Sequence, residues 1–121
     1  MMTSVFQVAL GGALGASARY GVNLGAARMF GPAFPWATLT VNLAGSFLMG
    51  LLVAVLGRDS AWAPFLLTGL LGGFTTFSAF SLDAVALWQK GQGGMAALYV
   101  GASVILSLAA LVAGLSMGRV A

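Results

Sequence analysis

Long apolar runs separated by short polar or glycine- and proline-containing segments divide this chain into four parts. The runs cover residues 3–24, 36–56, 61–88 and 95–117. A helix of about 20 mostly apolar residues is long enough to cross the hydrocarbon core of a bilayer. Tryptophans near the ends of the runs, at positions 36, 62 and 88, are typical of residues at a membrane interface. The pattern predicts an all-α membrane protein with four transmembrane helices in a single domain, residues 1–121.

Polar and small residues recur every four positions on three of these helices, so that each set shares one helix face. The sets are Thr38, Asn42 and Ser46; Tyr99, Ser103 and Ser107; and Thr3, Gln7, Gly11, Gly15, Arg19 and Asn23. Helix packing is one interpretation, since serine and threonine can bond to their own helix backbone. A water-lined path is the other, and Arg19 either extends to the interface or faces such a vestibule. The groups are mostly hydrogen-bond donors without negative charge, which suits a small anion better than a cation.

The amino-acid composition excludes most other functions. The sequence is 60% hydrophobic and 6% charged, against about 25% charged residues in a typical soluble domain. It has no cysteine and no histidine, and its two acidic residues are Asp59 and Asp83, which we interpret as caps or interfacial charges. Neither a zinc site nor a serine or cysteine hydrolase can be assembled from this set. The sequence is therefore not that of an enzyme.

The stretch GGFTTFSAFS, residues 72–81, is unusual for the centre of a membrane helix. Adjacent glycines cost about 1 kcal/mol each relative to alanine, and the following threonines compete for backbone hydrogen bonds. We expect the helix to break here. The freed carbonyls are suited to a hard cation such as sodium, particularly if two symmetry-related breaks meet. Phe77 and Phe80 share a face just beyond the break, either as packing bulk or with their positive ring edges turned to an anion.

Lysine and arginine are almost evenly divided between the two predicted sides of the membrane. Arg28 and Lys90 share one side, with Arg19 if it counts as flanking, and Arg58 and Arg119 share the other. So weak a bias permits insertion in both orientations, although a single orientation set by other signals remains open. Glycine pairs with four-residue spacing favour close helix packing and oligomers: Gly11 and Gly15, Gly21 and Gly25, Gly69 and Gly73, and Gly114 and Gly118.

Taken together, "GGFTTFS", "GGALGASARYGVN", "TLTVNLAGSFLMG" and the Tyr99, Ser103, Ser107 track resemble the Fluc (CrcB) family of fluoride ion channels. The resemblance covers nearly the whole chain. It implies an antiparallel, dual-topology homodimer in the cell (inner or plasma) membrane. It also implies a fluoride-selective channel that passively releases cytoplasmic fluoride and so protects against its toxicity.

The resemblance also implies roles for particular residues. The fluoride pathway would contain Asn42, Phe77, Phe80, Ser78, Tyr99, Ser103, Ser107 and Arg19. The backbone carbonyls of Gly72 and Thr75 from both subunits would hold a structural sodium ion. Ala79 stands where many relatives have threonine or serine, so any hydrogen bond from that side chain is lost.

Two other functions remain as alternatives. A small dual-topology multidrug exporter has a similar size, but such exporters resemble one another in a membrane-embedded glutamate, and this chain has no glutamate. A non-transporting assembly subunit would need the glycine pairs but not the donors on several helices around a break. Substitutions such as Asn42→Leu or Ser107→Ala would harm a channel and not such a subunit.

Overall fold

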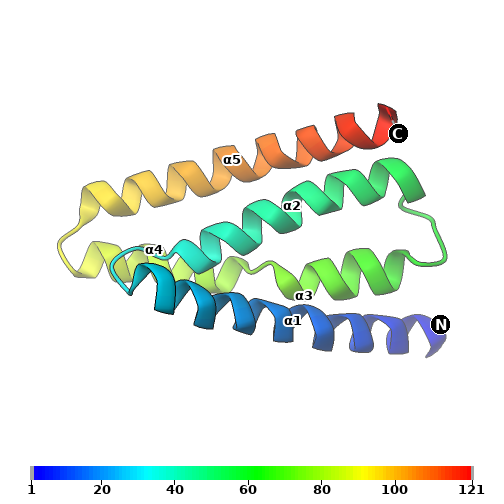
Figure 1. Ribbon diagram of the computed structural model, residues 1–121, viewed down its shortest axis with the longest axis horizontal. Helices are drawn as coiled ribbons and strands as arrows, with labels where there is room; N and C mark the ends of the chain where they lie inside the picture. Colours follow the sequence, from blue (N-terminus) through cyan, green and yellow to red (C-terminus); the bar gives the residue numbers. More distant parts are fainter. Residues whose placement is uncertain (1, 121) are drawn as a thin grey trace.

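The computed structural model describes residues 2–120, and every regular element in that range is helical. The elements are α1 (Met2–Phe30), α2 (Trp36–Leu56), the π-helix η1 (Pro64–Leu71), α3 (Gly72–Phe74), α4 (Phe77–Gln89) and α5 (Gly93–Val120). Because η1, α3 and α4 follow one another along one path, they form a single interrupted helix, called here the third helix (Figure 1). The predicted all-α class with four helices is confirmed.

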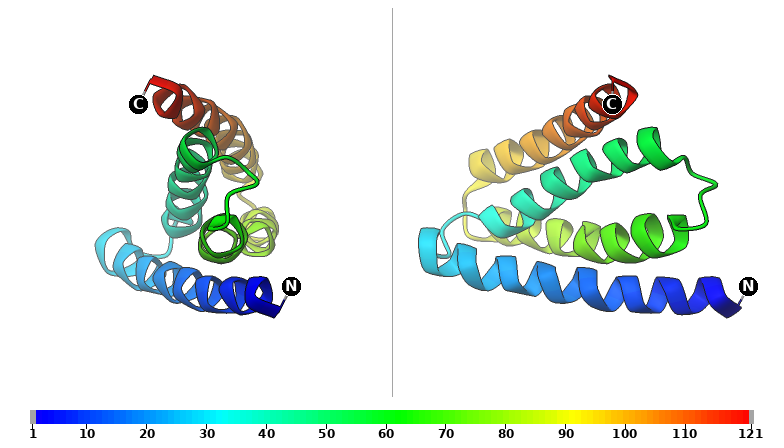
Figure 2. Two further views of the ribbon diagram at one scale, coloured as in Figure 1. Left: turned by 90° about the vertical axis from the view of Figure 1, so that its right-hand side faces the viewer. Right: turned by 45° about the vertical axis from the view of Figure 1, so that its right-hand side comes forward.

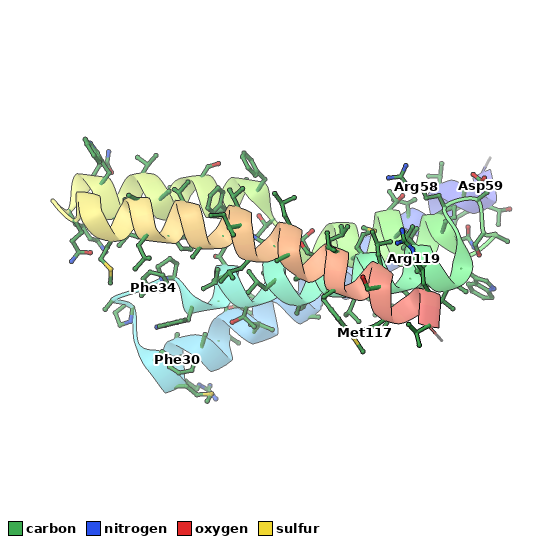
Figure 3. All side chains as sticks on the ribbon, turned by 90° about the horizontal axis from the view of Figure 1, so that it is seen from above. Phe30, Phe34, Arg58, Asp59, Met117 and Arg119 are labelled. Carbon is green, nitrogen blue, oxygen red and sulfur yellow. The ribbon has the colours of Figure 1, made fainter. Side chains whose placement is uncertain are left out.

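The helices run up and down alongside their neighbours, and both termini lie at the same end of the molecule (Figure 1). The third helix lies between α1 and α2, with α5 on the far side of α2 (Figure 2). The α1–α2 loop lies at one end, while Arg58, Asp59 and Arg119 lie at the other (Figure 3).

Three helices within residues 2–120 are long and apolar enough to cross a membrane: Trp36–Leu56, Pro64–Gln89 and Gly93–Val120. The chain is a multi-pass membrane protein. Although α1 has 29 residues, it carries polar side chains along its length and is not among these three.

Glycines let α1 pack directly on the backbone of the third helix. A Cβ atom on Gly73 would lie 2.8 Å from the carbonyl oxygen of Gly12, and one on Gly69 would lie 3.0 Å from the Cα atom of Gly11. A Cβ atom on Gly15 would likewise contact the backbone of the third helix. Any side chain at these positions would force the two helices apart, so close packing requires glycine here.

A second glycine contact joins α2 to α5. A Cβ atom on Gly114 would contact the carbonyl oxygen of Phe47, and one on Gly50 would contact the backbone of α5. Three of the four predicted glycine pairs thus lie at close helix contacts. Gly21 and Gly25 do not, because no neighbouring atom within the described residues lies within 4 Å of either Cβ position.

Candidate functional site

The third helix breaks at two threonines. Thr75 has φ −86° and ψ 159°, and Thr76 has φ −154° and ψ 120°, so both are extended while the residues on either side are helical. The predicted break is confirmed, but the glycines do not cause it. Gly72 is helical, with φ −63° and ψ −37°, and Gly73 serves the contact with α1. The β-branched threonines, whose hydroxyls compete for backbone bonds, interrupt the helix instead.

Asn42 on α2 replaces the backbone partners that the break removes. Its Oδ1 accepts a hydrogen bond of 2.8 Å from the N–H of Thr76, and its Nδ2 donates one of 3.1 Å to the carbonyl of the same residue. The Asn42 side-chain amide therefore pairs with both the backbone N–H and the backbone carbonyl of Thr76. This pairing holds α2 against the break and keeps the extended backbone from being left unsatisfied.

Arg19 on α1 approaches the break from the opposite side. Its Nε donates a hydrogen bond of 3.1 Å to the carbonyl oxygen of Gly73. This carbonyl lies at the C-terminal end of the first half of the third helix, where a positive charge is favoured by the helix dipole. Arg19 thus contacts the backbone at the break.

Two backbone carbonyl oxygens at the break have no hydrogen-bond donor within the described residues. The Leu71 oxygen accepts from both the N–H and the Oγ1 of Thr75, each at 3.0 Å. By contrast, no donor among residues 2–120 forms a hydrogen bond with the carbonyl oxygens of Gly72 and Thr75. Gly72 is exposed at the surface of the chain and Thr75 is half-buried. Both oxygens therefore remain available as ligands.

The second half of the third helix begins with a threonine cap. The Oγ1 of Thr76 accepts a hydrogen bond of 3.1 Å from the N–H of Ala79, and it lies 3.2 Å from the Oγ of Ser78. The first amides of α4, which follow this cap, point out of the helix N-terminus at the break. Such a terminus carries partial positive charge and favours anions.

A cavity of about 420 Å³ lies beside the break, between the third helix, α2 and α5. We call it the break cavity; it is lined by Asn42, Gly45, Ser46, Met49, Thr75, Thr76, Phe77, Phe80, Ser103, Val104, Ser107, Leu108 and Leu111. The Oγ of Ser103 is buried and has no hydrogen-bond partner within the described residues. A buried hydroxyl without a partner is costly unless something else accepts its proton.

The structure thus brings five of the eight predicted pathway residues together and leaves three outside. Asn42, Phe77, Phe80, Ser103 and Ser107 line the break cavity, and Ser78, Tyr99 and Arg19 do not. Thr75, predicted to hold sodium, also lines it, while Gly72 does not.

Phe77 and Phe80 form one aromatic pair with very different surroundings. Their ring centroids are 5.5 Å apart and the rings are tilted by 51°. The side chain of Phe80 is 8% exposed, whereas that of Phe77 is 76% exposed on the outer surface of the chain. Phe80 is therefore a buried part of the cavity wall, whereas Phe77, which also lines the cavity, is exposed at the surface of the chain.

Asp83 is not a helix cap, one of the two roles expected from the sequence. It lies in the middle of α4, where its Oδ2 accepts hydrogen bonds from the Oγ1 of Thr38 at 2.7 Å and from the hydroxyl of Tyr99 at 3.2 Å. Its position inside a predicted membrane span was the available signal, because a carboxylate at membrane depth needs partners. The polar face of α2 pairs with this acid as well as with the break.

A multi-pass helical protein whose central helix is broken beside a donor-lined cavity belongs to the class of small channels and transporters. Its sequence matches the family described as CrcB-like protein, Camphor Resistance (CrcB), over residues 6–115. The chain belongs to this family, and the resemblance noted from the sequence is confirmed.

Several relatives carry the name Fluoride-specific ion channel FluC. The chain is 65% identical to that of Cereibacter sphaeroides over 120 residues, which is 98% of this chain and 97% of the relative. It is 58% identical to that of Paracoccus denitrificans over 121 residues, 98% of this chain and 97% of the relative. It is 51% identical to that of Agrobacterium fabrum over 122 residues, 98% of each chain. These are names of ion channels, so the prediction that the chain is not an enzyme is confirmed, and neither the exporter nor the assembly subunit finds support.

Proposed function

We propose that this chain is a fluoride-specific ion channel that lets cytoplasmic fluoride leave the cell passively and so protects against fluoride toxicity. The observation that carries the proposal is the break cavity, in which the buried Ser103 hydroxyl has no partner. Close relatives that cover almost the whole chain carry the name of such a channel.

The lining of the break cavity favours an anion. None of its residues is acidic. Its polar groups include the hydroxyls of Ser103 and Ser107 and the second Nδ2 hydrogen of Asn42, which remains after one hydrogen bonds Thr76. Small, strongly hydrated fluoride must exchange its water for donors of this kind, and the N-terminus of α4 adds positive potential.

The two phenylalanines would contribute their ring edges. The edge of an aromatic ring is electropositive and the face is electronegative, so only an edge attracts an anion. Phe80 lines the cavity and is 8% exposed, and the exposed ring of Phe77 would lie against a second copy of the chain.

The free carbonyl oxygens of Gly72 and Thr75 fit a structural sodium ion. Hard cations take several oxygen ligands, and two carbonyls from one chain are too few. Because Gly72 lies at the surface, a second chain related by symmetry could bring its own pair to the same ion. The ion would fix the two breaks against each other and neutralise their carbonyls.

The same argument supports an antiparallel homodimer with dual topology, in which all four helices of the domain, residues 1–121, cross the cell membrane. At 1.5 Å per residue, the 29 residues of α1 span about 43 Å, enough for a tilted crossing. The open positions of Gly21 and Gly25 on α1 offer further surface for a close helix contact. The balanced lysine and arginine count permits the two orientations.

Fluoride efflux from liposomes tests the proposal, with Ser103→Ala as the decisive variant. Losing the unpartnered hydroxyl should slow fluoride efflux without reducing the amount of dimer. Ser81→Ala is the matched control, because the Ser81 hydroxyl is exposed and donates to the Phe77 carbonyl of its own helix at 3.0 Å. Equal efflux from wild-type, Ser103→Ala and Ser81→Ala dimers would contradict the pathway through the break cavity.

A further inference from the structure

Thr38, Asp83 and Tyr99 form a closed group, called here the carboxylate cluster. They come from α2, α4 and α5, and a single oxygen of Asp83 accepts the protons of both hydroxyls, at 2.7 Å and 3.2 Å. The Tyr99 side chain is completely buried and Thr38 is 7% exposed. Both residues that carry these hydroxyls are therefore packed within the chain.

The carboxylate cluster lies between two cavities. On one side Phe80, a wall of the break cavity, packs against Tyr99 with ring centroids 5.3 Å apart. On the other side Thr38 and Asp83 line a second cavity of about 330 Å³ that opens among α1, α2, α4 and the α1–α2 loop. Phe34 in that loop packs edge to face against Tyr99, with ring centroids 5.5 Å apart. Figure 3 labels Phe34 and so marks this end of the molecule. The cluster therefore lies between the two cavities, and an ion on a path that joins them along this contact would pass it.

In the structure, the cluster offers no hydroxyl proton to such an ion. Both protons are directed at the Asp83 oxygen, so an approaching anion meets a carboxylate and oxygen lone pairs. For an anion to pass, one of the two hydroxyls must turn away from the carboxylate and donate its hydrogen bond to the anion instead. Hydrogen bonds to carboxylates are about twice as strong as neutral ones, so only a strong acceptor can compete.

We propose that Asp83 is a specificity-determining residue, whose hold on the hydroxyls of Thr38 and Tyr99 admits fluoride and rejects chloride. Fluoride is small and a strong hydrogen-bond acceptor, and chloride is larger and a weak one. Charge repulsion by the carboxylate acts on both monovalent anions, so it slows both without separating them. Competition for a hydroxyl proton does separate them. This inference rests on the proposed function.

No positively charged side chain among the described residues forms an ion pair with the Asp83 carboxylate. Its two hydrogen-bond partners are both neutral hydroxyls. Lys90 and Asn23 line the same second cavity and carry hydrogen-bond donors. An anion leaving the cluster would find them there.

The test compares initial fluoride and chloride efflux from valinomycin-clamped liposomes containing wild-type or Asp83→Asn protein. An asparagine oxygen holds the hydroxyls less tightly, so the chloride-to-fluoride rate ratio should rise by about tenfold, the factor equivalent to about 1.4 kcal/mol. Thr38→Val, which removes one of the two hydroxyls with little change in size, should raise the ratio by a smaller factor. Asp59→Asn in the α2–η1 loop is the matched control and should leave the ratio unchanged.

A purely structural role for the cluster would lower the amount of folded dimer or slow both ions equally, leaving the ratio unchanged. An unchanged ratio in folded Asp83→Asn and Thr38→Val dimers that still conduct fluoride would overturn this inference. If Asp83→Asn does not fold, the ratio in Thr38→Val decides. Absence of fluoride efflux from the wild-type protein would instead contradict the proposed channel function, so the two failures are distinguishable.

Discussion

Replacing Asn42 by leucine tests whether one side chain holds the broken helix in place. Leucine is similar in size but can neither accept from the Thr76 N–H, now at 2.8 Å, nor donate to its carbonyl, now at 3.1 Å. Both groups of the peptide backbone would lose their partners at once. No other donor or acceptor among the described residues pairs with them across the helices, so the extended conformation would lose its main support.

The size of the effect follows from two lost hydrogen bonds in a half-buried site. Leaving a buried polar group unsatisfied costs about 1–3 kcal/mol, and hydrogen bonds between membrane helices average about 0.6 kcal/mol with values up to about 1.7. Partial exposure favours the lower part of the first range. We therefore expect Asn42→Leu to lower the free energy of unfolding by about 2–4 kcal/mol.

Equilibrium unfolding in mixed micelles of mild detergent and sodium dodecyl sulfate, followed by circular dichroism, measures this change. Ser46→Ala is the matched control, since Ser46 lies one turn further along α2, lines the same cavity and makes no side-chain hydrogen bond within the described residues. That variant should change the unfolding free energy by less than about 0.5 kcal/mol. An Asn42→Leu protein as stable as the Ser46→Ala protein would refute the role assigned to the pairing.

Three further predictions follow from the same contacts. Gly114→Ala should destabilise the fold by about 1–3 kcal/mol because the new methyl group would clash with the α2 backbone. Gly21→Ala, at an open Cβ position, should not. Equal unfolding free energies for the two variants in the same detergent unfolding experiment would contradict this. Thr76→Ala should lose the α4 cap and about 1 kcal/mol, with Thr76→Ser restoring it, and identical unfolding midpoints for all three proteins would exclude the cap. Phe80→Ile should slow fluoride efflux while the dimer still assembles, measured by size-exclusion chromatography and a fluoride electrode, and wild-type efflux from that dimer would remove Phe80 from the pathway.

The sequence was most informative where local chemistry decides the outcome. The apolar runs predict the helices, and the GGFTTFSAFS stretch predicts a break because glycine, threonine and serine all weaken a helix. The four-residue spacing of polar groups put Asn42 on one face of α2 and Ser103 and Ser107 on one face of α5, and in the structure these residues line the break cavity. These inferences need only the helix period and the cost of unpaired polar groups in lipid.

The details that depend on a partner from another helix could not be obtained this way. Gly73 is helical and packs closely against α1, and the break lies at Thr75 and Thr76. Asp83 contacts Tyr99 only because α4 and α5 pack side by side. No local sequence pattern predicts that Thr38 on α2 also bonds Asp83. Tyr99 shares the period of the two serines, yet its hydroxyl is already engaged by a carboxylate and lies outside the break cavity.

The most direct test of the central claim is an ion-selective-electrode recording of efflux from liposomes that contain the purified wild-type protein. The vesicles hold either fluoride or chloride, and valinomycin with potassium clamps the charge. We predict fast fluoride efflux that depends on valinomycin, with negligible chloride efflux from matched vesicles. A folded, dimeric preparation that releases no fluoride, or that releases chloride at the same rate, would contradict a fluoride-specific channel.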